Sequence, residues 1–265
     1  MLRTGRETSG RGGWMAGETL LVGLAHPDDE LGAAGTILAQ RARGDRVVLV
    51  WLTRGEMTEA FGAISQAEVA AIREEQGRAA GELLGCETRF LDFADTWVEA
   101  TPAAARRVAA LVAEVRPTGL LTFGDSWAQG MRHPDHQAAG KIFRDAITLA
   151  RIAKVVAPGE PVRTPIPVFT YRGAHSPIPA VAVDVEPYLD GIHALARFYR
   201  ERIGFGDAGW VDGRLRRAGA AHGLRYAELF DAWETRPGQV PSLLPAEIDS
   251  AEPVHPTRTD QPQEE

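Results

Sequence analysis

The sequence predicts an α/β protein with a doubly wound, mostly parallel sheet in a single domain. Short apolar runs of strand length alternate with segments of helical spacing along most of the chain. The apolar runs are nearly continuous rather than alternating, which is typical of strands buried on both faces of a parallel sheet. The 265 residues suit one large α/β domain or two small ones.

The first half of the predicted sheet repeats a strand followed by a helix. Residues 19–25 are almost entirely apolar, and a helical pattern over 31–43 follows them until Gly44. Residues 46–53 are rich in β-branched side chains, and a second helix is expected over 66–84. This order is that of a parallel strand–helix–strand unit.

The next strands continue the same alternation. Residues 88–93 form the third expected strand, and Pro102 suits the first turn of a helix over 102–115. Residues 120–123 form the fourth, followed by a helix over 134–150. Further along the chain, the patterns predict two strands and two closing helices, at 168–171, 180–184, 187–203 and 213–232. The whole reads as a Rossmann-like sheet, whose ligand site lies at the carboxyl ends of its strands.

Composition divides the chain into one folded domain and two tails. Residues 1–17 are polar and Gly-rich, and residues 236–265 are acidic with recurrent proline, so we expect both to be disordered. The domain is therefore expected over 18–235. Neither a signal peptide nor a membrane-spanning segment is predicted, and a cytoplasmic location is expected.

Charge and cysteine content exclude several classes of protein. Lys and Arg number 29 against 36 Asp and Glu, so a net charge of −7 argues against nucleic acid as the main partner. The single cysteine, Cys86, excludes an internal disulfide and a cysteine-rich zinc or iron–sulfur site. A small-molecule partner is expected instead. A homo-oligomer remains open because no sequence pattern marks an interface.

The first chemically informative segment follows the first strand and reads Ala-His-Pro-Asp-Asp-Glu over residues 25–30. The residue before a proline avoids the helical region, so we expect His26 to be extended and Pro27 to begin a helix. His26 and Asp29 are three residues apart and can converge on one point. In a helix the Asp28 side chain would point about 100° away from that of Asp29, so it can face a bound water.

The second segment, His-Pro-Asp-His at residues 133–136, follows the fourth strand and has the same pattern: a histidine, a proline that suits a helix start, and a possible ligand three residues after the histidine. His26, Asp29 and His136 would supply two imidazoles and one carboxylate, the ligand set of an open catalytic Zn²⁺ site. The same set binds Fe²⁺ in non-haem iron enzymes, so both metals stay open. Acidic residues at a helix N-terminus also occur without any site, as favourable charges near the helix dipole.

Both segments resemble the two signatures of the PIG-L/LmbE-like family of metal-dependent N-deacetylases. Residues 52–56 (Leu-Thr-Arg-Gly-Glu) resemble the family's segment after the second strand. The helix pattern with Ile72-Arg73, Ala79-Ala80 and Leu84-Gly85 is also similar, as is the ending at 226–230. The resemblance covers about residues 19–232 and implies a Rossmann-like fold.

The resemblance also implies an activity and roles for individual residues. The activity is zinc-dependent hydrolysis of an N-acetyl group, commonly on an N-acetylglucosaminyl moiety of an amino-sugar conjugate. By motif position, Asp28 would be the general base and His133 the second catalytic histidine, which stabilises or protonates the tetrahedral intermediate. Arg73 would contact substrate, and Asp95 would line the pocket. The implied metal ligands are His26, Asp29 and His136.

Some residues carry less specific signals. Gln76 stands where many relatives have glutamate, which affects local substrate contacts rather than the metal site. Asp135 is either a carboxylate that orients a histidine or a plain helix-terminal charge. His175 follows a predicted strand and is either a pocket residue or an ordinary loop histidine. The loop 54–65 is either a substrate collar or a simple connection. Structural or peripheral positions are expected for the remaining histidines, His193, His222 and His255.

Three other functions compete with N-deacetylation of an amino sugar. The same site could hydrolyse another amide, such as an acylated amine or a thiol conjugate. A non-catalytic sugar- or metal-binding module could use the same fold, although the presence of Asp28 argues against it. An Fe²⁺ oxygenase could use the same three ligands, but such enzymes are usually built on β-rich folds.

Overall fold

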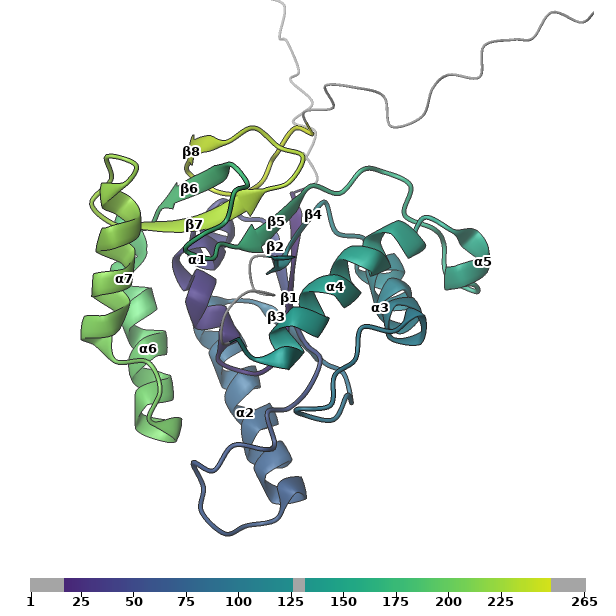
Figure 1. Cartoon of the computed structure of the whole chain (residues 1–265), viewed down its shortest axis with the longest axis horizontal. Helices are drawn as coiled ribbons and strands as arrows, with labels where there is room; N and C mark the ends of the chain where they lie inside the picture. Colours follow the sequence, from purple (N-terminus) through teal and green to yellow (C-terminus); the bar gives the residue numbers. More distant parts are fainter. Residues whose placement is uncertain (1–16, 126–131, 249–265) are drawn as a thin grey trace, which may run out of the picture.

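The computed structural model describes residues 17–125 and 132–248, and its centre is a mixed sheet of eight strands. In space the strands follow the order β3-β2-β1-β4-β5-β7-β6-β8 (Figure 1). Five strands, β1 to β5, pair in parallel, whereas β7 runs antiparallel to both of its neighbours. The strands are β1 Thr19–Leu24, β2 Arg46–Trp51, β3 Glu87–Phe90, β4 Gly119–Phe123, β5 Val168–Tyr171, β6 Ala180–Asp184, β7 Ala227–Ala232 and β8 Gly238–Val240. This architecture confirms the predicted Rossmann-like, mostly parallel sheet.

The helices cover both faces of this sheet. On one face α3, α4 and α5 pack together, and on the other α1 and α2 pack against α6, which also contacts α7 (Figure 1). The helices are α1 Ala34–Ala42, α2 Gln66–Leu84, α3 Pro102–Val115, α4 Pro134–Leu149, α5 Ala153–Val156, α6 Leu189–Ile203 and α7 Ala208–Ala220, with 3-10 turns η1 Asp29–Ala33 and η3 Glu186–Tyr188. None of the helices in the described ranges combines the length and the apolar composition that a membrane span requires.

The order of the strands determines where a ligand site can form. From β1 the chain moves outward through β2 to β3, and then returns to place β4 on the other side of β1. The loops after β1 and β4 therefore leave the sheet in opposite directions, which opens a crevice at the carboxyl ends of these two strands. Both His-Pro-Asp segments follow these two strands.

Local signals in the sequence explain the helix boundaries. Ser65 caps α2 with a reciprocal pair of hydrogen bonds to Glu68, and Gly85 ends the helix with a φ of 68°. Thr101 accepts a hydrogen bond from the Ala104 amide at the start of α3, and Pro102 follows as the first helical residue. The bounds of α3 are those that the sequence predicts.

The prediction of one helix over 213–232 is wrong in its second half. Helix α7 ends at Ala220, and residues 227–232 form β7 between β5 and β6. The buried strand β7 contains a polar residue, Glu228, and tolerates it because its side chain is hydrogen-bonded. Its carboxylate accepts hydrogen bonds from the amides of Gly35 (3.1 Å) and Thr36 (2.8 Å), in the first turn of α1.

The predicted C-terminal boundary at residue 235 is also wrong. Residues 238–240 form β8 beside β6, and Leu244 is 1% exposed. Gln40 exchanges two hydrogen bonds of 3.1 Å with the backbone of Leu244. Long-range packing, which proline content does not report, therefore extends the domain to residue 248. The rest of the predicted tails, 1–16 and 249–265, lies outside the described residues.

Candidate active site

The turn after β1 differs from the predicted helix start. The 3-10 turn η1 begins at Asp29 and α1 only at Ala34, so Pro27 lies in a turn rather than in a helix. Asp28 has a φ of 115°, a backbone conformation that a residue with a side chain rarely adopts. Its amide donates a hydrogen bond of 3.0 Å to the Glu30 carboxylate. Such strain at a non-glycine residue is commonly found at functional sites.

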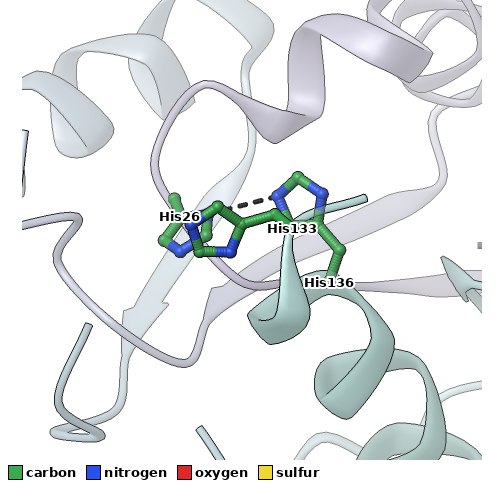
Figure 2. A group of neighbouring side chains, drawn as sticks. All are labelled: His26, His133 and His136. Carbon is green, nitrogen blue, oxygen red and sulfur yellow. Dashed lines mark hydrogen bonds between the residues drawn. The ribbon is translucent and has the colours of Figure 1, made fainter. Parts of the chain in front are cut away.

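Three predicted ligands converge between β1 and β4. Nδ1 of His26 lies 3.2 Å from Nε2 of His136, which lies 3.0 Å from Oδ1 of Asp29. Nδ1 of His26 is 3.9 Å from Oδ2 of Asp29. Figure 2 shows the two imidazoles facing each other across this point. Ligands bound at about 2.0–2.2 Å to a tetrahedral ion are themselves about 3.3 Å apart, so the His26–His136 and His136–Asp29 separations each match those of two ligands on one ion.

Asp29 is held firmly in this arrangement. Its Oδ2 accepts hydrogen bonds from the amides of Ala25 (3.0 Å) and His26 (2.8 Å), which leaves Oδ1 directed at His136. Burial alone would raise the pKa of Asp29, but the charge and hydrogen bond of His136 and the charge of His26 lower it below the usual range. The carboxylate therefore stays ionised and available to a cation.

Two further carboxylates hold the other nitrogen of His26. Nε2 lies 3.1 Å from Oδ1 of Asp95 and 3.2 Å from Oδ2 of Asp135. Burial would lower the pKa of His26, but hydrogen bonds to Asp135 and Asp95 and the charge of Asp29 raise it to about 10. A carboxylate behind a metal-binding histidine fixes its tautomer and orientation. Here the two carboxylates hold Nε2 of His26, and Nδ1 is directed toward Nε2 of His136.

Asp135 is fully buried and connects the first turn of α4 to the loop after β3. Its Oδ2 accepts a hydrogen bond from the amide of Thr96 (2.7 Å), and its Oδ1 accepts one from Val98 (3.3 Å). Of the two interpretations that the sequence left open, this geometry favours a residue that orients His26. Asp95 also accepts a hydrogen bond from the Met57 amide (2.9 Å), so it joins the β2 and β3 loops at the site.

Arg73 reaches Asp28 from α2. Its Nη2 lies 2.7 Å from Oδ2 of Asp28 and also donates to the carbonyl of Pro27, while Nη1 donates to Oε1 of Gln76 (3.1 Å). Burial raises the pKa of Asp28, and Arg73 opposes this; with the repulsion from Asp29 the result is about 6. Gln76 thus contacts Arg73 as a neutral group, so Asp28 is the carboxylate that pairs with this guanidinium.

His133 lies beside the other two histidines. Its ring centroid is 4.6 Å from that of His26, and the nitrogens of His26, His133 and His136 lie close enough together to be a second candidate ligand group (Figure 2). Nδ1 of His133 accepts a hydrogen bond from the Asp135 amide (3.2 Å). Burial and the charges of His26 and His136 lower its pKa. A neutral His133 with this hydrogen bond presents Nε2–H as a donor.

The structure adds two residues that the sequence analysis did not assign to the site. Glu30 is fully buried and accepts hydrogen bonds from Tyr199 Oη (2.5 Å) and Trp51 Nε1 (3.2 Å) while it binds the Asp28 amide. Tyr171 donates a hydrogen bond of 3.2 Å from its hydroxyl to the Asp29 carbonyl. The position of Glu30 at the end of the first motif was a sequence signal for its role at the site, whereas no local pattern pointed to Tyr171.

The remaining candidates lie away from the ligand cluster. His175 is exposed and is not among the residues that line the two cavities beside His26. His193 pairs with Asp212 at 2.7 Å on the surface of α6. Burial raises the pKa of Cys86 to about 12, which keeps this thiol unreactive. His255 lies outside the described residues.

Two cavities meet at the cluster of His26, Asp28 and His133. The smaller one, of about 230 Å³, is bordered by charged side chains that include Arg73 and Asp95. The larger one, of about 500 Å³, is bordered by the histidines and aspartates of the cluster, by two arginines, and by apolar and aromatic side chains from η1, β4, β5, β7 and the α6–α7 corner. The candidate site is therefore open on two sides of different chemical character.

Fold and site together define a Rossmann-like α/β protein with a candidate metal centre at the switch point of its sheet. Within that class, the sequence family described as PIG-L, GlcNAc-PI de-N-acetylase, matches residues 21–147. Residues 21–147 thus match the PIG-L family model, and every predicted site residue lies within this range.

Individual relatives agree with this assignment. The chain is 34% identical over 127 residues to diacetylchitobiose deacetylase of Thermococcus kodakarensis, which covers 47% of each protein. It is 27% identical over 203 residues to 1D-myo-inositol 2-acetamido-2-deoxy-alpha-D-glucopyranoside deacetylase of Corynebacterium glutamicum, covering 65% of this chain and 69% of that one. The chain thus matches about half of the length of the first of these relatives.

The fold is also that of a solved relative. N,N'-diacetylchitobiose deacetylase from Pyrococcus horikoshii superimposes with a TM-score of 0.73 at 22% identity, over 82% of this chain and 84% of that one. At this identity the likeness concerns the fold.

Proposed function

We propose that this protein is a metal-dependent hydrolase that removes an N-acetyl group from an amino-sugar conjugate. The observation that carries the proposal is the convergence of His26, Asp29 and His136 beside Asp28, within a PIG-L domain. Relatives named as deacetylases of acetylated amino sugars support the reaction and the substrate class.

His26, Asp29 and His136 would hold the metal, for which we propose Zn²⁺, with Fe²⁺ as the alternative. The ion would supply a water of lowered pKa and polarise the amide carbonyl. Asp29 contributes an ionised carboxylate, and Asp95 and Asp135 keep the proton of His26 on Nε2, so that Nδ1 is free to bind.

Asp28 would act as the general base that accepts the proton of the attacking water. Arg73 and the Glu30 carboxylate restrain its side chain and its backbone, respectively. His133 would donate a hydrogen bond from Nε2 to the oxyanion that develops on the amide carbonyl. Collapse of the tetrahedral intermediate would break the C–N bond as the proton that Asp28 accepted passes to the leaving nitrogen, releasing acetate and the free amine.

Metal content and turnover test the proposal together. Elemental analysis of protein purified without added metal should find about one zinc or iron per chain. The metal-loaded protein should release free amine and acetate from N-acetylglucosaminyl compounds. Asp28→Asn should retain the metal and lose turnover by about 10²-fold or more. Undiminished turnover in that variant, or a chain that takes up no metal, would contradict the proposal.

A further inference from the structure

We propose that the larger cavity binds an apolar group of the substrate, and that Trp210 and Phe205 on the α6–α7 corner select for that group. This inference rests on the proposed function, because it concerns the part of the substrate beyond the reacting amide. Neither residue lies within the matched family region, which ends at residue 147.

Exposed aromatic side chains gather at this cavity. Trp210 is 48% exposed and Phe205 is 43% exposed, although large apolar side chains are usually buried. Their ring centroids lie 5.9 Å apart, and both side chains line the cavity that holds His26 and Asp29 at its base. An exposed aromatic pair at the edge of a cavity is typical of a surface that a ligand covers.

Further apolar side chains line the same cavity. Phe123 stacks on the His136 imidazole with centroids 4.4 Å apart, and Tyr171 lies 5.1 Å from Phe123. Leu31 and Leu229 line it too. A group bound here would therefore contact aromatic and aliphatic carbon beside the candidate metal ligands.

The two arginines that border the cavity already have partners within the protein. Arg172 pairs with Asp231 at 2.5 Å, and Arg214 lies 3.9 Å from the buried Glu228. Arg214 also donates to the carbonyls of Gly32 (3.0 Å) and Leu31 (3.3 Å). The cavity therefore favours an apolar group over an anion or a polyol, which would require partners that these arginines already have.

The corner is fixed relative to the metal position. Asp207 caps α7 by accepting a hydrogen bond from the Trp210 amide (3.0 Å). The Arg214 guanidinium lies 5.8 Å from the Trp210 ring centroid and binds the carbonyls of the η1 turn next to Asp29. The aromatic wall and the catalytic turn are therefore one connected unit, and a group against Trp210 is positioned relative to the amide.

The apolar group could be attached to the substrate in two ways, and the experiment distinguishes them. Isothermal titration calorimetry would measure binding to metal-loaded Asp28→Asn, in which turnover is blocked. The ligands are N-acetylglucosamine, its phenyl β-glycoside, N-octanoylglucosamine and diacetylchitobiose. We expect the phenyl glycoside, if the group is carried on the anomeric carbon, or the octanoyl amide, if on the acyl carbon, to bind about tenfold tighter than N-acetylglucosamine.

Substitution of Trp210 then tests the residue. Trp210→Ala in the Asp28→Asn background should remove most of this tenfold gain, and Trp210→Phe should keep part of it. Leu83→Ala is a matched control, because Leu83 is 50% exposed on α2 and lines neither cavity at His26. Equal affinity for all ligands, tightest binding of diacetylchitobiose, or a gain that survives Trp210→Ala would overturn the inference.

The readout separates this inference from the proposed function. The affinities are measured on a variant that does not need to turn over, so they stand whether or not the wild type is a deacetylase. Absence of amine release from every ligand by the metal-loaded wild type would instead count against the proposed function.

Discussion

The carboxylate of Asp28 lies 2.7 Å from the guanidinium of Arg73, although 45 residues separate them along the chain. The arginine side chain is 2% exposed, so the ion pair is sheltered from water on one side. Asp28 is therefore held by a buried cation while its backbone is held in a left-handed conformation. This pairing joins α2 to the turn after β1.

Loss of the Arg73 cation should move the acid limb of the pH profile. Arg73 lowers the pKa of Asp28, so Arg73→Ala raises it, and the carboxylate loses its ionised form at a higher pH. We expect kcat to fall by about 10²-fold and the acid limb of kcat/KM to shift upward. Arg78→Ala, on the exposed face of the same helix, is the control. An unshifted acid limb would show that Asp28 is not the titrating base.

Metal binding should release protons. In the metal-free protein the carboxylates around His26 raise its pKa to about 10, so the imidazole is protonated at pH 8 and must lose a proton to bind a metal. Calorimetry in two buffers of different ionisation enthalpy should give a release of about one proton per Zn²⁺ at pH 8. Metal affinity should rise with pH up to the pKa of His26.

Asp135→Asn provides the comparison for this proton release. Removal of one carboxylate lowers the pKa of His26, so fewer protons are released at pH 8. It also loosens the histidine, and affinity for the metal should fall by about 10–100-fold. Identical proton release in the two proteins would contradict the assignment of His26 Nδ1 as a ligand.

Glu228 should make stability depend on pH. Burial raises its pKa above the ordinary value, so the folded state holds the proton more tightly than the unfolded chain. Its stabilising effect is therefore greatest below the unfolded-state pKa and is lost as pH rises through the folded-state pKa. Glu228→Gln loses one of the two side-chain oxygens that accept hydrogen bonds from the backbone amides of α1. This loss should lower the unfolding free energy by about 1–3 kcal/mol at low pH.

The difference in stability between wild type and Glu228→Gln should thus narrow as pH rises. Urea unfolding from pH 5 to pH 8 measures it. Glu99→Gln, at an exposed position, should give a curve parallel to that of the wild type. If Glu228→Gln also runs parallel to the wild type, the carboxylate does not titrate differently on folding.

Leu244 should be part of the folding core despite its place in a proline-rich segment. Its side chain fills the space beside Gly119, where an added Cβ would lie 2.6 Å from it. Leu244→Ala should lower the unfolding free energy by about 2–5 kcal/mol in urea. Leu83→Ala, at a half-exposed position, should change it by less than about 0.5 kcal/mol. A small effect at Leu244 would show that residues beyond 235 are dispensable.

Sequence patterns alone were sufficient to predict the strand–helix order as far as α4 and to single out the two His-Pro-Asp segments. Such features are local, since hydrophobic spacing and helix-capping residues act over a few positions. The sequence also placed His26 and His136 after strands that a doubly wound sheet brings side by side. The candidate ligand set was therefore predictable once the topology was assumed.

The groups that surround the candidate ligands, in contrast, depend on how distant segments pack. Asp95 and Asp135 meet at Nε2 of His26 because the loop after β3 and the first turn of α4 lie at the same edge of the sheet. The sequence could not distinguish β7 from a helix, because the pairing that makes it a strand comes from β5 and β6. Trp210 reaches the site for the same physical reason: contacts between distant segments depend on packing, which local spacing does not encode.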